Sequence, residues 1–386
     1  MITVFYVEMN VMNVESIVNY LMPSYHNAFV RHPESLDEAQ AIVNRHLETS
    51  CLVIRKNKDT YVFDELLCAD KTCIDRSQNV FSSIKAIIKK HRITVSGERY
   101  IFHFKGDACH EEPDFPLLSN SRNVGNGNII LWPLLIRRNY LLTPYRYSPF
   151  LHDEITRFRN SPDKIVWDEK IPVFLFRGMN SGNPFPSVKY PWNQSRVSRC
   201  ALLVESLKLP SELRTMVDVG FNELYPRGKL LRKKFRDKEF LASSCGKYLQ
   251  QGSTIEDLQN DVELALANLK PSLSRTRLYR YKYLLCPEGF DCASALSWVL
   301  ASNSLAIVPP FHYENVIINS QALRPYVHFL PIREDYSDLA DVMRWALAHD
   351  QECRQMVQDA NKYMQPFVNG NCMERVQRQI IEKLLA

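Results

Sequence analysis

The pattern of hydrophobic and polar positions alternates between strand-like and helix-like segments in the first part of the chain. Short apolar runs rich in β-branched and aromatic residues predict strands at residues 2–7, 51–54, 61–63 and 100–104. Between these runs, residues 35–49 and 78–91 have helical composition, and the second segment repeats its apolar positions at helical spacing. Strands that alternate with helices are typical of an α/β layer architecture.

The second part of the chain repeats this alternation more regularly. Predicted strands lie at residues 173–176, 281–286, 305–308 and 328–332. Predicted helices lie at residues 195–207, 255–269, 291–301 and 337–348, and residues 313–322 are predicted as helix or loop. The order indicates a doubly wound parallel sheet. Residues 351–386 are helical in composition except for a break at 366–371.

A polar segment at residues 161–170 separates the two parts and is predicted to be a linker. A chain of 386 residues is long enough for about two domains. We therefore expect an amino-terminal domain at 1–165 and a carboxy-terminal domain at 166–366, with a last helix at about 367–386 that packs back on the first domain. A cleft between the domains is the default place for a functional site.

Composition indicates an ordinary globular protein, with 45% hydrophobic and 24% charged residues and a net charge of +5. The longest apolar run, residues 129–136, is far shorter than the roughly 20 residues that span a bilayer. The chain starts without a basic segment followed by an apolar stretch and a cleavage site. We therefore expect a cytoplasmic protein, with membrane association as an additional option.

The absence of several sequence motifs argues against some classes of enzyme and of metal site. None of the ten cysteines forms a Cys-x-x-Cys pair, so we expect reduced thiols and no zinc ribbon. Neither G-x-G-x-x-G nor G-x-x-x-x-G-K-[ST] occurs, which argues against a dinucleotide dehydrogenase and a P-loop NTPase. An Asp-x-Asp pair for a divalent cation is also absent. We expect neither metal nor cofactor, and any phosphate would have to be bound by Arg, Lys, hydroxyl and backbone N–H groups.

The stretch from Tyr281 to Trp298 is the most informative one. It predicts a buried strand, a tight turn at Gly289 and a helix that starts near Asp291, which would leave the backbone N–H groups of residues 292–294 free to bind an anion. The candidate binding residues are Gly289, Asp291, Cys292, Ala293 and Ser294. The alternative is that Asp291 only caps the helix and the other residues are core.

Two arginines could bind a diphosphate in the same crevice. Arg177 and Gly178 end the predicted strand at 173–176, and Arg196 lies near the start of the next predicted helix. Guanidinium groups bind phosphate oxygens bidentately, which makes these residues donor-site candidates. A surface pair of arginines without a ligand is the alternative, and for Arg177 we favour a structural role.

Asp107 follows the apolar strand at 100–104 and is the candidate general base. A carboxylate is ionised at neutral pH and can accept the proton of a hydroxyl group that attacks. The alternative is an ordinary turn residue after Gly106. The neighbouring His110, Glu111 and Glu112 could be metal ligands, but their consecutive placement does not match a helical ligand pair.

The densest basic segment, residues 227–238, contains seven Arg and Lys residues. It is a candidate for peripheral contact with an anionic membrane, with a phosphorylated glycan or with nucleic acid. A solvated helix face is the alternative. The net charge of +5 gives nucleic acid little support, so we expect no nucleic-acid partner.

Several of these segments together resemble glycosyltransferase family 90, over residues 100–367. The motifs are Phe-Arg-Gly at 176–178 followed by Arg196, Val-Asp-Val-Gly-Phe at 217–221, Tyr-Lys-Tyr at 281–283, Glu-Gly-x-Asp-x-Ala-Ser-x-Leu-x-Trp from 288, and Pro-Tyr-Val-His-Phe before Asp-Tyr-Ser-Asp-Leu. The family contains fungal capsule-associated proteins, animal protein O-glucosyltransferases and bacterial lipopolysaccharide glycosyltransferases. At the glycine turn this chain is similar to the bacterial type, whose pattern contains Asp291 and Ala293-Ser294, whereas the animal branch has an arginine at the position of Ala295.

The resemblance implies a GT-B fold, in which two Rossmann-like domains face a central cleft. It also implies inverting, metal-independent transfer of a sugar from a UDP-sugar. We expect the sugar to be glucose, xylose or galactose and the acceptor to be a hydroxyl of an oligosaccharide, glycolipid or glycoprotein. By this resemblance Asp107 is the catalytic base, Arg196 contacts the donor diphosphate, and Glu314 holds the ribose hydroxyls. The alternative is a catalytically inactive protein that binds a nucleotide-sugar or a glycan.

Overall fold

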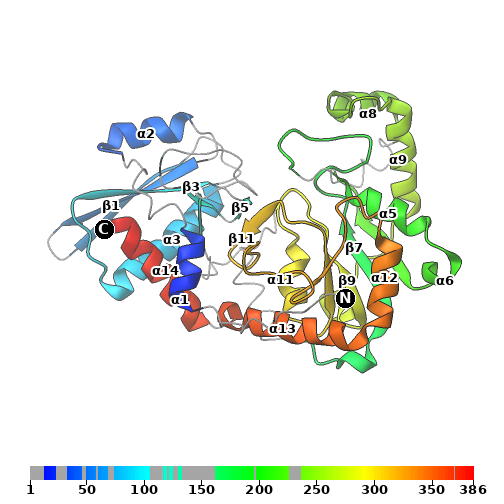
Figure 1. Ribbon diagram of the computed structural model, residues 1–386. Helices are drawn as coiled ribbons and strands as arrows, with labels where there is room; N and C mark the ends of the chain where they lie inside the picture. Colours follow the sequence, from blue (N-terminus) through cyan, green and yellow to red (C-terminus); the bar gives the residue numbers. More distant parts are fainter. Residues whose placement is uncertain are drawn as a thin grey trace.

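The chain forms two α/β lobes that lie side by side (Figure 1). The computed structural model describes residues 13–22, 33–45, 49–57, 60–67, 74–104, 115, 117–119, 121–124, 129–132, 161–194, 197–225, 236–368 and 370–386. One five-stranded sheet lies in each lobe, and a short two-stranded sheet joins residues from both parts of the chain. The α/β architecture expected from the sequence is confirmed.

The sheet of the amino-terminal lobe is mixed, with strand order β2-β1-β3-β4-β6. Its strands are β1 (Thr49–Asn57), β2 (Thr60–Leu66), β3 (Glu98–Phe104), β4 (Leu117–Ser119) and β6 (Ile129–Leu131). β1 is antiparallel to β2 and β3, whereas β4 is parallel to β3 and β6. The expected Rossmann-like pattern is therefore wrong for the first three strands, because the two-residue connection between β1 and β2 allows only a hairpin. The strand predicted at 2–7 lies outside the described residues.

Helices cover both faces of this mixed sheet. They are α1 (Val14–Leu21), α2 (Leu36–Arg45) and α3 (Ile74–His91). On α3, the apolar side chains at helical spacing are buried, as the sequence predicts: Val80, Ile84, Ile87 and Ile88. The last helix, α14 (Gly370–Leu385), packs against α1 and α3, where Glu374 accepts a hydrogen bond from Lys90 at 2.5 Å.

The sheet of the carboxy-terminal lobe is entirely parallel, with strand order β12-β10-β9-β7-β8. Its strands are β7 (Ile171–Met179), β8 (Val217–Glu223), β9 (Tyr281–Leu285), β10 (Leu305–Val308) and β12 (Leu330–Pro331). Numbered within the lobe, the order is 2-1-3-4-5, which is a doubly wound arrangement. The chain reverses its direction of winding between β7 and β9, and ligands in such sheets bind outside the carboxyl ends of the strands at that point.

Both faces of the parallel sheet are covered, as expected for buried strands. One face packs against α5 (Arg199–Leu207), α9 (Ile255–Ala267) and α12 (Leu339–Ala348), and the other against α11 (Ser294–Leu300) and α13 (Asp350–Val368). The shorter helices are α6 (Ser211–Arg214), α8 (Lys238–Ser244) and α10 (Arg275–Leu278), with 3-10 turns at Trp167–Glu169 and Gly246–Tyr248. A break in the helix is predicted at 366–371. α13 continues through Pro366 to Val368 and α14 begins at Gly370, so the break is shorter than predicted.

A buried ion pair lies where the chain enters the carboxy-terminal lobe. The ammonium of Lys170 lies 2.8 Å from the carboxylate of Asp163, with both side chains at most 1% exposed. Lys170 also donates to the hydroxyl of Ser304 at 3.0 Å and to the carbonyl of Tyr279. Burial lowers the pKa of Lys170, although the hydrogen bond and charge of Asp163 act against this. The ion pair and these hydrogen bonds hold the 161–170 segment against the residues next to β9 and β10 of the parallel sheet.

The two lobes are joined by a small antiparallel sheet of β5 (Ser121–Asn123) and β11 (Tyr313–Asn315). Arg122 on β5 forms an ion pair with Glu314 on β11 at 3.3 Å, and each side chain is 4% exposed. The remaining N–H groups of Arg122 donate to the carbonyls of Ile129 and Tyr20. The prediction of helix or loop at 313–322 is wrong for its first three residues, which form β11. A strand of three residues has no recognisable sequence pattern, and β11 forms because it pairs with β5, which is distant in the sequence.

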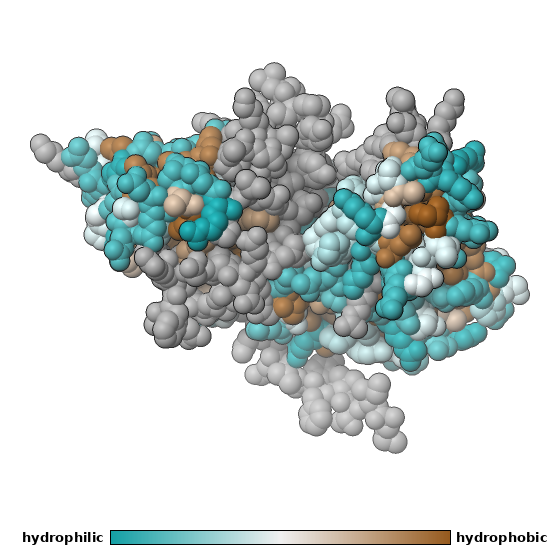
Figure 2. Space-filling model, turned by 90° about the horizontal axis from the view of Figure 1, so that it is seen from above, coloured by the Kyte–Doolittle hydropathy of each residue, from teal (hydrophilic) through white to brown (hydrophobic). Residues whose placement is uncertain are grey.

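The surface seen in Figure 2 is mainly hydrophilic over the described residues, with hydrophobic residues in small groups. Among the described helices, none combines the length and the apolar character that a bilayer crossing requires.

Candidate functional site

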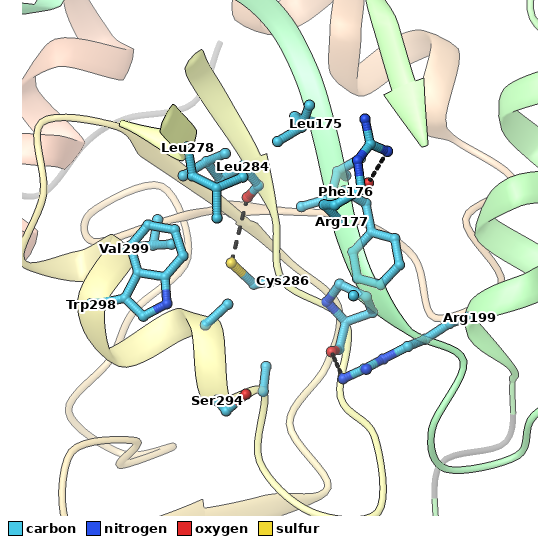
Figure 3. A pocket seen from close by; sticks show the side chains of 15 residues that line it. Leu175, Phe176, Arg177, Arg199, Leu278, Leu284, Cys286, Ser294, Trp298 and Val299 are labelled. Atoms are coloured by element: carbon cyan, nitrogen blue, oxygen red, sulfur yellow. Dashed lines mark hydrogen bonds between the residues drawn. The ribbon is translucent and has the colours of Figure 1, made fainter. Parts of the chain in front are cut away.

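A pocket lies at the point where the winding of the parallel sheet reverses (Figure 3). It is lined by Leu175, Phe176, Arg177, Gly178, Arg199, Leu278, Leu284, Leu285, Cys286, Pro287, Ala293, Ser294, Ala295, Trp298 and Val299. Ser294 and Trp298 on α11 lie across the pocket from Arg199 and Phe176 (Figure 3). Four of the predicted donor-site residues line this pocket: Arg177, Gly178, Ala293 and Ser294.

Two loops meet beside this pocket, one after β7 and one after β9. A Cβ atom added at Gly182 would lie 2.8 Å from the carbonyl oxygen of Gly289, and one at Gly289 would lie 2.6 Å from the hydroxyl of Ser181. The side-chain amide of Asn193 donates to the carbonyl of Gly289 at 2.9 Å. The glycines therefore permit a backbone approach that larger residues would prevent.

Arg199 connects these two loops through hydrogen bonds to both of them. It is the first residue of α5, and the helix is capped by the side chain of Ser198. Its guanidinium donates to the carbonyls of Met179, Pro287 and Glu288 at 2.8 to 2.9 Å. Burial lowers the pKa of Arg199. Because these partners are neutral carbonyls, the side chain brings a buried positive charge to the wall of the pocket.

A second group of charged side chains lies at the neighbouring strand β8. Arg177, 5% exposed, forms an ion pair with Asp218, and Lys270 binds the same carboxylate at 2.5 Å. Burial opposes the ionisation of Asp218, but the hydrogen bonds and charges of Lys270 and Arg177 outweigh it and lower the pKa. The Nε atom of Arg177 is buried and has no hydrogen-bond partner. Two cations thus share one carboxylate, leaving a net positive charge.

Glu288 lies in the loop after β9 and is 7% exposed. Its carboxylate accepts hydrogen bonds from the backbone N–H groups of His312 and Tyr313 at 3.1 to 3.2 Å. Burial raises the pKa of this carboxyl to about 8, although the backbone hydrogen bonds oppose the shift. The side chain connects the site to the segment that leads into β11.

Glu288→Gln is expected to remove a pH dependence of stability. The folded wild type keeps the proton up to about pH 8, whereas the unfolded carboxyl loses it near pH 4.3. Unfolding therefore releases a proton between these values, and stability falls as pH rises, on the order of 3 kcal/mol. Urea unfolding at pH 5 and pH 8 measures this loss. Glu256→Gln, on an exposed surface, should keep it. An equal loss in Glu288→Gln and wild type would contradict the assignment.

The start of α11 differs from the prediction. The helix begins at Ser294 with Ala293 as its N-cap, so Asp291 does not cap it. Cys292 and Ala293 are buried, and burial raises the pKa of the Cys292 thiol well above its usual value. Ser294 is exposed and lines the pocket. The helix therefore starts three residues later than the sequence predicts, and anion binding by the N–H groups of residues 292–294 stays a prediction.

The other predicted residues fall in two groups. Asp107 and Arg196 lie outside the described residues, as do residues 227–235 of the basic segment, so their roles stay predictions. Glu314 does not line the pocket, and its carboxylate is held by Arg122 and by the backbone and hydroxyl of Ser320. A contact with ribose stays a prediction, and it would require this buried group to become accessible.

Arg199 is not among the site residues predicted from the sequence. The predicted helix started at Ser195, which placed Arg196 in the first turn, whereas α5 begins at Arg199. The signal that could have found it is Ser198, a good N-cap directly before an apolar helical run. Over the part of the chain that the structure describes, no group of three His, Cys, Asp or Glu residues is placed to hold a metal ion.

The strand order and the pocket define the carboxy-terminal lobe as a doubly wound α/β domain with a crevice at its switch point. Residues 220–383 match the family model described as "Glycosyl transferase family 90". The resemblance noted in the sequence is therefore confirmed for this part of the chain, which runs from β8 to α14.

Individual relatives agree with the family match. The chain is 30% identical over 95 residues to the O-glucosyltransferase LpsA of Dichelobacter nodosus, covering 25% of this chain and 30% of that protein. It is 22% identical over 213 residues to Protein O-glucosyltransferase 2 of Danio rerio, covering 55% and 42%. It is also 24% identical over 227 residues to the uncharacterized protein 179R of Invertebrate iridescent virus 6, covering 56% and 17%. The chain thus spans less than half the length of each of these relatives.

Proposed function

We propose that this protein is a glycosyltransferase that moves a sugar from a UDP-sugar to a hydroxyl of a glycan acceptor. The single observation that carries the proposal is the match of residues 220–383 to family 90, in the lobe whose switch point forms the pocket. Two similar proteins named O-glucosyltransferases favour glucose as the transferred sugar, with xylose and galactose as further candidates.

The proposed donor site is the pocket between β7, β9 and α11. Positive charge from Arg199 and from the group of Arg177 and Lys270 favours a bound diphosphate there. Ser294 offers a hydroxyl at the mouth of the same pocket. We propose that Arg196, which precedes α5 by three residues in the sequence, contacts the diphosphate in this site. With these cations, departure of UDP needs no metal ion.

The proposed acceptor side is the amino-terminal lobe, in a GT-B arrangement. Asp107 follows β3 and would accept the proton of the acceptor hydroxyl as that oxygen attacks the anomeric carbon from the side opposite UDP. Such a displacement inverts the anomeric configuration. Closure of the lobes over the donor would exclude water and limit hydrolysis of the UDP-sugar.

The purified protein is expected to turn over at least one of UDP-glucose, UDP-xylose and UDP-galactose, and to retain that activity in excess EDTA. The measurement is release of UDP, with and without a mixture of oligosaccharide acceptors. Activity that disappears with EDTA and returns with Mn²⁺ would contradict the metal-independent mechanism. Failure to bind any of the three donors would contradict the proposed function itself.

A catalytically inactive binding protein is the second candidate, because the relatives are covered only in part. Single-turnover assays separate the two: stoichiometric UDP-sugar that stays intact in the presence of acceptors would favour the binding protein. We also propose a cytoplasmic location, with the 227–238 segment as the contact for an anionic membrane.

A further inference from the structure

A second pocket, of about 430 Å³, lies along the edge of the parallel sheet, between β12 and α12. It is lined by Pro310, Tyr326, Leu330, Pro331, Ile332, Arg333, Asp338, Asp341, Val342 and Trp345. None of these residues lines the pocket at the switch point. Its volume lies within the range of small-molecule binding sites, whose lining is mostly apolar and aromatic with a few polar groups.

Two aromatic rings form part of this lining. Tyr326 is 54% exposed, and its ring lies 5.6 Å from the ring of Trp345. The ring of Trp345 stacks in parallel on His349 at 4.4 Å, which fixes its orientation. Tyr326 stays largely exposed although its ring packs on Trp345, so the pair presents an apolar platform to a ligand.

The backbone holds Tyr326 in an unfavourable conformation. Its φ angle is +59°, a left-handed value that costs a non-glycine residue about 1 to 2 kcal/mol. The turn around it is fixed by hydrogen bonds from Tyr326 N–H to the carbonyl of Phe329 and from His328 N–H to the carbonyl of Arg324. Strain that the surrounding structure enforces is concentrated at functional sites.

The charges of the pocket favour a neutral ligand. Arg333 lies 3.9 Å from Asp338, and Asp341 lies 3.3 Å from Arg344, which also lies 4.0 Å from Glu212. Each of these charged groups therefore has a partner of opposite sign, and no positive charge is left over for a phosphate or another anion. Arg333 and Asp341 are 70% and 82% exposed, so their donors and acceptors can reach hydroxyl groups.

An added β-strand is a poor occupant. β12 is an edge strand of only Leu330 and Pro331, and proline has no N–H group to donate to a neighbouring strand. A pyranose ring, in contrast, presents C–H groups on its faces, which pack on aromatic rings, and hydroxyls around its rim.

We propose that this pocket is a binding subsite for a neutral oligosaccharide. The choice of a glycan, rather than another neutral ligand rich in hydroxyls, rests on the proposed glycosyltransferase function.

The test is calorimetric binding of maltotetraose, cellotetraose and xylotetraose, without any nucleotide present. We expect one of them to bind the wild type, and Trp345→Ala and Tyr326→Gly each to weaken that binding at least about tenfold, since stacking on one ring contributes on this scale. Trp192→Ala is the matched control, because Trp192 is 44% exposed and stacks on Tyr190 outside the pocket.

Tyr326→Gly separates binding from folding. Glycine adopts the left-handed conformation without strain, so the thermal midpoint should stay the same or rise while sugar binding is lost. Binding of none of the three sugars, or unchanged binding in Tyr326→Gly, would overturn the proposal. UDP binding, measured separately, should not change in any of these variants, so failure of the donor site would be recognised independently.

Discussion

Asp107→Asn is expected to slow sugar transfer at least about 100-fold, while the affinity for UDP stays unchanged. Asn has nearly the same size and polarity as Asp, but it cannot accept the proton of the attacking hydroxyl. The measurement is the rate of product formation at saturating UDP-sugar and acceptor, together with UDP binding by calorimetry.

The matched control is Asp37→Asn, on the exposed surface of α2 in the same lobe, which should leave the rate unchanged. A rate for Asp107→Asn within about twofold of wild type would remove base catalysis by this residue. Loss of UDP binding in the same variant would instead indicate a structural defect that spreads to the other lobe.

Lys170→Met is expected to destabilise the protein by about 3 to 5 kcal/mol, because it leaves the buried carboxylate of Asp163 without its cation. Asp163 is 1% exposed and also accepts the backbone N–H groups of Ile165 and Asn303, so it cannot turn toward solvent. The measurement is the midpoint of urea unfolding with the accompanying m-value.

Two further variants sharpen this test. Lys208→Met breaks the exposed pair with Glu205 and should change stability by less than about 1 kcal/mol. Adding Asp163→Asn to Lys170→Met removes the unpaired charge and should restore part of the loss. A Lys170→Met protein as stable as Lys208→Met would show that the buried pair contributes little.

The sequence predicts the secondary structure correctly where the local hydrophobic pattern agrees with the burial of the element in the fold. The apolar run at 281–286 becomes β9, and the alternation of strands and helices after residue 170 yields the parallel sheet, because strands buried on both faces must be apolar throughout. The fold class of this lobe and the position of its crevice follow from that alternation.

The rest depends on contacts between residues far apart in the chain. The strands β4, β5, β6 and β11 have three residues each and carry no period of their own. The loops around Gly182 and Gly289 are shaped by Arg199, whose partners lie 18 to 89 positions away. Local pattern likewise could not show that Glu314 faces Arg122 across the lobes, because these residues are separated by 192 positions.

The ribbon of β5 and β11 has a mechanical consequence when it is considered with α13 and α14. These helices carry the chain from the carboxy-terminal lobe back to the amino-terminal one (Figure 1). One hydrophobic cluster continues from Ile17 and Leu52 of the amino-terminal lobe to Leu284 of the other lobe. A motion of the lobes that separates β5 from β11 would therefore have to expose part of this core as well as break the buried Arg122–Glu314 pair.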